Sequence, residues 1–170
     1  MQPSERCRSC GMTLPELLVA VLVLGLMAAV GIGGVGRSLA RTRVEAATRQ
    51  LAVELEQARS SAEAAGTACA LALTPQGWAQ DPDSPLPPCR FEAEALVQPV
   101  QLSHNLAGPL RVASNGLVLD GGTVVVAAAG SDLQRCLVVS LPLGVVRSGR
   151  SKAAPGATPR SSDCVVDPSL

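Results

Sequence analysis

The chain has 170 residues and balances 14 basic against 14 acidic side chains, so it has no formal net charge at pH 7. A chain of this length holds one modest domain, and its neutrality gives no overall preference for nucleic acid or for acidic partners. Its aromatic residues are Trp78 and Phe91 alone, which predicts an aliphatic core and argues against stacking on bases or sugars as a main activity.

A long apolar segment lies near the N-terminus. No charged residue occurs between Leu17 and Gly36, and these positions would form about 30 Å of helix, enough to cross a bilayer. Glu16 stands immediately before this segment, where a carboxylate is costly in a membrane unless an opposite charge offsets it. A secretory signal cleaved near Ala28 or a plain single-pass anchor would explain the apolar segment, but neither explains Glu16.

Residues 37–66 have the pattern of an amphipathic helix. Glu45 and Arg49 are spaced for an i,i+4 ion pair on its polar side. We expect one helix to run from the apolar segment to Gly66, where glycine is a natural C-terminal stop. Apolar residues recur on the other side at steps of three and four, and these are Val44, Ala47, Leu51, Leu55, Ala58 and Ala62.

Beyond Gly66 the pattern changes to short β-rich runs that predict a separate head. Residues 67–74 predict a strand, residues 75–78 a turn, and residues 81–89 a proline-rich loop that suits neither a helix nor a central strand. The head is therefore expected to pack a small antiparallel β structure against the end of the helix, which makes the fold class α+β.

Hairpins dominate the second part of the head. Asn115-Gly116 is a strong hairpin signal, and a second hairpin is expected around Pro142-Leu143-Gly144. The tail after residue 150 is polar, and we expect it to be disordered unless Cys164 ties it down. The strands predicted in this part cover residues 110–114, 117–120, 123–129, 136–141 and 144–149.

The cysteines fall into two groups. Two precede the apolar segment, Cys7 and Cys10, and four follow it. In an exported head the later four predict two disulfides, for which three pairings are possible. Their spacing does not fit a zinc site, so no metal and no cofactor is expected. Among the pairings we favour Cys69 with Cys89 and Cys136 with Cys164.

The run Gly11-Met12-Thr13-Leu14-Pro15-Glu16 resembles the class III signal of type IV prepilins and pseudopilins. The resemblance implies that a prepilin peptidase cuts after Gly11 and methylates the new amine of Met12. It also implies that Glu16 pairs with the methylated amine of a neighbouring subunit in a filament. The chain would then divide into a leader (1–11), a transmembrane half-helix (12–36), an amphipathic stalk (37–66) and a periplasmic head (67–170).

The run from Gln57 to Gly66, the Gly77-Trp78 turn and the late Gly144-x-x-Arg147 pattern together resemble the GspH/FimT family. That family has a pilin-like fold with a long N-terminal helix and a β-rich head. The resemblance implies a minor pseudopilin of type II secretion or a minor pilin of type IV pili. Such a protein is held in the bacterial inner membrane, has other pilins and prepilin peptidase as partners, and takes no small-molecule substrate.

Some FimT-like proteins bind DNA through a basic C-terminal motif. Here Val145 stands where that motif has its first arginine, but Arg147, Arg150 and Lys152 lie in an acid-free segment and are candidate phosphate contacts. The other reading is a solvated cationic strand end, which we favour. No catalytic motif is present, and we expect His104 to be a surface residue in a loop, so the chain is not predicted to be an enzyme.

Overall fold

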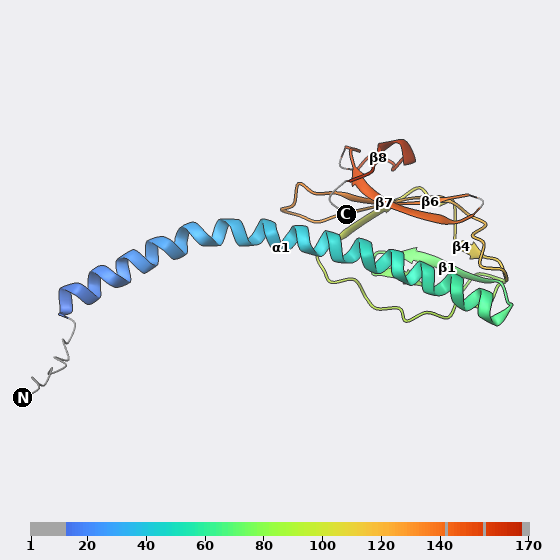
Figure 1. The fold of residues 1–170 in the computed structure, drawn as a ribbon, viewed down its shortest axis with the longest axis horizontal. Helices are drawn as coiled ribbons and strands as arrows, with labels where there is room; N and C mark the ends of the chain where they lie inside the picture. Colours follow the sequence, from blue (N-terminus) through green and yellow to red (C-terminus); the bar gives the residue numbers. More distant parts are fainter. Residues whose placement is uncertain (1–12, 142, 155, 168–170) are drawn as a thin grey trace, which may run out of the picture. The chain divides into compact units, whose positions relative to one another are not determined.

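A computed structural model describes residues 13–141, 143–154 and 156–167, with residues 28–35 described by their backbone alone (Figure 1). By its internal contacts the chain divides into two units, residues 1–36 and 37–170. The helix α1 (Leu14–Ala65) begins in the first unit and ends in the second, which confirms the continuous helix predicted from the sequence. Within the described ranges, no helix is long and apolar enough to span a membrane.

The C-terminal end of α1 is closed by a glycine in the left-handed region. Gly66 has φ +60°, and its N–H donates to the carbonyl of Glu63 at 3.1 Å. The N–H of Thr67 donates to the carbonyl of Ala62 at 3.2 Å. This pair of bonds is a Schellman motif, and glycine is favoured there because it adopts a positive φ without steric cost.

The apolar side of α1 is buried as its spacing predicts, but the predicted ion pair between Glu45 and Arg49 does not form. Glu45 contacts Arg41 on the helix at 3.7 Å and Arg135 in the head at 3.3 Å, whereas no ion pair with Arg49 is present among the described residues. The apolar residues that are at most 3% exposed include all six of the predicted stripe: Val44, Ala47, Leu51, Leu55, Ala58 and Ala62.

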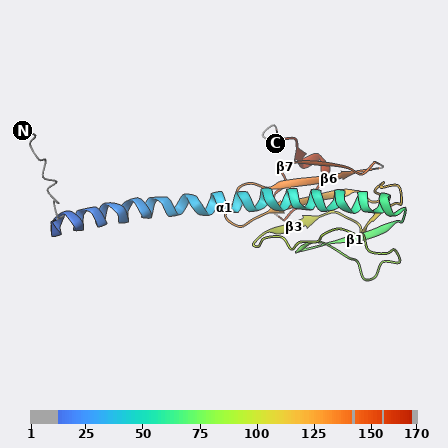
Figure 2. The ribbon, with the colours of Figure 1, turned by 60° about the horizontal axis from the view of Figure 1, so that its bottom comes forward.

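The head contains two antiparallel sheets that share one aliphatic core with the second half of α1 (Figure 2). The three-stranded sheet has the order β2-β1-β4, with β1 (Cys69–Thr74), β2 (Gly77–Ala79) and β4 (Leu110–Val112). The five-stranded sheet has the order β3-β5-β6-β7-β8, with β3 (Gln101–His104), β5 (Gly122–Ala127), β6 (Arg135–Ser140), β7 (Val145–Ser151) and β8 (Cys164–Val165).

Three parts of the head differ from the sequence prediction. Gly77 and Trp78, predicted to lie in a turn, belong to β2. After the Asn115-Gly116 turn, residues 117–120 do not form a strand, and a single bridge joins Val118 to Val112. His104 is exposed, as expected, but it lies at the end of β3 rather than in a loop. The described part of the tail is structured, as expected for a tail held by Cys164: the Cys136–Cys164 bridge forms, β8 pairs with β7, and a short 3-10 helix (Ser161–Asp163) precedes β8.

Candidate assembly site and basic strand

Glu16 forms part of the N-terminal cap of α1. Its Oε2 accepts a hydrogen bond from the N–H of Thr13 at 3.3 Å and another from the Thr13 hydroxyl at 3.2 Å. The carbonyl of Thr13 accepts the first helical bond, from the N–H of Leu17 at 3.1 Å. The spacing Thr13-x-x-Glu16 is that of a capping box, in which a carboxylate also interacts favourably with the positive end of the helix dipole. Pro15 is tolerated there because a first-turn N–H has no helical partner.

The predicted cleavage and methylation positions, Gly11 and Met12, lie outside the described residues. In the sequence, a cut after Gly11 would make Met12 the first residue. The new amine would therefore lie one residue before Thr13, whose N–H and hydroxyl bond to Glu16.

Apolar side chains cover the first turns of α1 and are exposed. Leu18 is 60% exposed, Leu22 65% and Met27 70%, and every other side chain from Leu14 to Met27 is also exposed. A contiguous apolar surface of this kind marks a site that another apolar body covers, either other helices or lipid.

Arg59 connects the last turns of α1 to two turns of the head. Its Nε donates to the carbonyl of Gly116 at 3.0 Å, and its Nη1 and Nη2 donate to the carbonyls of Gly144 and Leu143 at 3.3 and 3.4 Å. Its Nη1 also contacts Glu56 at 3.0 Å. Sequence reasoning identified the run that contains Arg59 but not this role, which depends on turns 57 to 85 residues away in the chain.

The basic residues of the C-terminal region do not share one face. Arg135 is buried, and its guanidinium pairs with Glu45 at 3.3 Å and with Asp167 at 2.7 Å, so it is not available to an external phosphate. On β7, Arg147 lies opposite Val138 and Arg150 lies opposite Arg135. Because side chains alternate along a strand, Arg147 and Arg150 point to opposite faces of the sheet. Lys152 is exposed just beyond β7.

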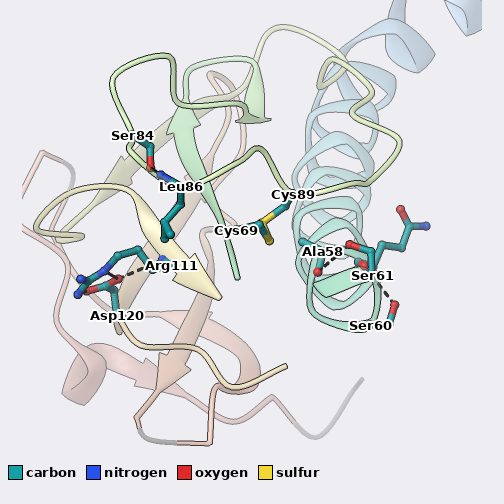
Figure 3. The surroundings of a disulfide bond; sticks show 10 residues. Ala58, Ser60, Ser61, Cys69, Ser84, Leu86, Cys89, Arg111 and Asp120 are labelled. Atoms are coloured by element: carbon teal, nitrogen blue, oxygen red, sulfur yellow. Dashed lines mark hydrogen bonds and ion pairs between the residues drawn. A yellow bond between two sulfur atoms is a disulfide. The ribbon is translucent and has the colours of Figure 1, made fainter. Parts of the chain in front are cut away.

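Two disulfides join the later cysteines in the pairing that we favoured. Cys69 of β1 bonds to Cys89 with a Cα–Cα distance of 4.8 Å, and Figure 3 shows this bridge beside the last turns of α1. Cys136 of β6 bonds to Cys164 of β8 with a Cα–Cα distance of 5.8 Å. The second bridge crosses β7 at Gly149, where an added methyl group would overlap the carbonyl of Val165. Within the described residues, no group of three or more His, Cys, Asp or Glu is arranged to hold a metal ion.

Comparison with protein families finds a match at the N-terminus. Residues 6–32 match the family described as the prokaryotic N-terminal methylation motif. The match covers the predicted cleavage position, Glu16 and most of the apolar segment, and it indicates a type IV pilin-like protein, a subunit of a pilus or pseudopilus. No curated protein and no solved structure matches the chain.

Proposed function

We propose that this type IV pilin-like chain is a minor pilin or pseudopilin that acts at the tip of a type II secretion pseudopilus or a type IV pilus. In this role it supports protein secretion or pilus biogenesis as an assembly subunit and not as an enzyme. The observation that carries the proposal is the exposed apolar start of α1, which is capped by Glu16 and lies within the matched motif. A surface of this composition stabilises the protein only when lipid or neighbouring helices cover it.

The proposed maturation begins at the inner membrane. Prepilin peptidase cuts after Gly11 and methylates Met12, and the apolar half-helix holds the chain as a single-pass anchor with the head in the periplasm. The two disulfides support this location, because structural disulfides form and persist in oxidising compartments.

In this proposal, Glu16 stabilises the filament relative to the isolated subunit. In a filament its carboxylate would pair with the methylated amine of a neighbouring subunit and so lose its exposure to water. Removing one partner of such a buried pair costs roughly 3–5 kcal/mol, because the other charge is left uncompensated. Glu16 is exposed in the isolated chain, so this cost arises only on assembly.

Two contacts support the narrower proposal of a GspH/FimT-like head. The residues that carried this resemblance include Arg59 and Trp78, and both join α1 to the head. Arg59 bonds to two turns, and the Nε1 of Trp78 donates to the carbonyl of Leu51 at 2.9 Å.

Mass spectrometry of the natural product tests the proposal. We expect a chain that begins at N-methylated Met12. Glu16→Gln should still be cleaved after Gly11 but should co-isolate with other pilin-like subunits at least tenfold less, whereas Glu63→Gln on the exposed side of α1 should behave as wild type. A product that still begins at Met1, or that was cut beyond Ala28, would contradict the proposal.

The alternative function is DNA binding by a competence-type minor pilin through Arg147, Arg150 and Lys152. Their solvent exposure supports it, while the opposite orientations of the two arginines favour the structural role. Electrophoretic shift of DNA by the detergent-solubilised chain at two salt concentrations decides between them, since phosphate contacts weaken steeply with salt. A shift at low salt that disappears in the Arg147→Ala, Arg150→Ala variant would establish DNA binding.

A further inference from the structure

An acidic pocket lies between α1 and the loop that precedes β3. Its volume is about 330 Å³, and three of its six lining residues are glutamates. Gln50, Val53, Glu54 and Gln57 line it from one face of α1, while Glu92 and Glu94 line it from the loop.

Glu54 is the buried member of this pocket. The residue is 4% exposed, and its Oε1 accepts hydrogen bonds from the Nε2 of Gln50 at 2.9 Å and from the N–H of Glu94 at 3.3 Å. Its Oε2 is buried and has no hydrogen-bond partner among the described residues. A buried carboxylate oxygen without a donor is costly, and an incoming cation is the group that removes this cost.

The other two glutamates add exposed negative charge to the same pocket. Glu92 and Glu94 are both exposed, and neither takes part in an ion pair among the described residues. Among the described residues, no cationic side chain lines the pocket, and none of its three glutamates forms an ion pair. Within the part of the chain that the structure describes, these carboxylates do not form a metal site, so a cationic side chain is the complementary group.

The complementary charge lies on α1 itself, about four turns earlier. Residues 37–49 contain four arginines and one glutamate, and Arg37 and Arg41 are exposed on one helix face because they are four residues apart. At 3.6 residues per turn, this face is roughly opposite the face that lines the pocket. One copy can therefore present its arginines on one side and its pocket on the other.

We propose that the acidic pocket binds Arg37 and Arg41 of a second copy of this chain. The guanidinium groups would pair with the exposed carboxylates of Glu92 and Glu94 and place positive charge beside the buried carboxylate of Glu54, since planar guanidinium groups fit carboxylates well. This inference rests on the proposed function, because it describes a contact between subunits of one assembly.

The helix geometry sets the offset between the two copies. Arg41 and Glu54 are 13 residues apart, which is about 20 Å along the axis of a helix. Parallel copies must therefore be displaced axially by this distance. Since the two contacting surfaces are different, the contact is heterologous, and the second copy presents its own pocket beside the first.

Co-isolation of two differently tagged full-length copies from membranes of the producing bacterium tests the contact. Reversal of the pocket charge in both copies, by Glu92→Arg with Glu94→Arg, should lower co-isolation by about tenfold, because like charges then face each other. Reversal of the other side, by Arg37→Glu with Arg41→Glu, should do the same. The variant with all four substitutions should recover to within about twofold of wild type.

The matched control is Asp83→Arg with Asp132→Arg, which makes the same charge change at two exposed carboxylates outside the pocket. It should co-isolate as wild type does. Unchanged emission of the single, buried Trp78 shows that each variant is folded. A four-substitution variant that stays as weak as either half, or pocket reversal without effect, overturns the inference.

The same samples separate this inference from the proposed function. If the chains begin at N-methylated Met12 and co-isolate with other pilin-like subunits while pocket reversal has no effect, the pocket inference fails and the proposed function stands. If the chains still begin at Met1, the proposed function fails.

Discussion

The indole nitrogen of Trp78 donates a hydrogen bond to the main-chain carbonyl of Leu51 at 2.9 Å. Both residues are buried, with Trp78 3% exposed and Leu51 fully covered. The bond joins β2 to the middle of the head-packed half of α1, so the only tryptophan fixes how the three-stranded sheet lies on the helix.

Trp78→Phe should lower the free energy of unfolding of the head by about 1–3 kcal/mol. The substitution removes the donor to Leu51 and leaves a small void, and lost bonds and lost core volume each cost energy of this order. Urea unfolding of the full chain in detergent, followed by circular dichroism, measures the change. Val53→Ala removes an exposed side chain on the same helix and should change stability by less than about 0.5 kcal/mol.

Arg59→Lys should loosen two turns of the head together. A lysine keeps the charge, but its single ammonium group cannot replace a guanidinium that donates to the carbonyls of Gly116, Leu143 and Gly144 at the same time. Hydrogen exchange should accelerate at least fivefold in both turns. Arg49→Lys changes an exposed arginine of α1 in the same way and should leave both turns protected; acceleration in only one turn would contradict the joint role of Arg59.

The Arg111–Asp120 pair should make the head less stable in acid. The Arg111 side chain donates to Asp120 at 2.8 and 2.9 Å, and this holds the pKa of Asp120 below its usual value of 3.8. Folded Asp120 therefore binds a proton less readily than unfolded Asp120. The stabilisation is present above about pH 4 and is lost as the pH falls through the lowered pKa.

Asp120→Asn should remove part of this acid dependence. Thermal unfolding between pH 7 and pH 2 measures it, and the variant should be less stable at pH 7 and should approach wild type at the acid end. Asp132→Asn, at an exposed carboxylate, should keep the wild-type profile. A full acid dependence in Asp120→Asn would show that this pair is not its source.

Gly149→Ala should displace the tail from the edge of the sheet. An added methyl group would overlap the carbonyl of Val165, and the backbone of β8 would have to shift. The Cys136–Cys164 bridge should then be reduced at least fivefold faster by dithiothreitol, while the distant Cys69–Cys89 bridge should keep its rate. Gly108→Ala, where an added methyl group meets nothing within 4 Å, should leave both rates unchanged.

Local patterns were sufficient to predict the helix and the longer strand pairs. The stripe from Val44 to Ala62 and the stop at Gly66 depend on residues a few positions apart, so the sequence alone specifies them. The β6–β7 pair was predicted for the same reason, since a short turn joins its strands. By contrast, β3 and β8 are short edge strands with little alternation, and β8 has two residues held beside β7 by a disulfide.

The charged contacts were harder to predict, because their partners are distant in sequence. Glu45 was expected to pair with Arg49, but it contacts Arg135, which lies 90 residues later and is buried. Arg147 and Arg150 were grouped because the predicted strand ended at residue 149, whereas β7 continues to Ser151 and places the two arginines on opposite faces. The acidic pocket could not be predicted, because the loop that precedes β3 and brings Glu92 and Glu94 to Glu54 has no periodic pattern.

Arg135 and Cys136 are neighbours on β6, and both hold the last described residues of the chain. Cys136 holds Cys164 on the outer face of the sheet, while Arg135 holds Asp167 on the face toward α1. The terminal stretch must therefore wrap around the sheet edge. It follows that translation must pass residue 164 before the Cys136–Cys164 bridge can form, and a stop codon ahead of residue 164 would leave Cys136 without its partner.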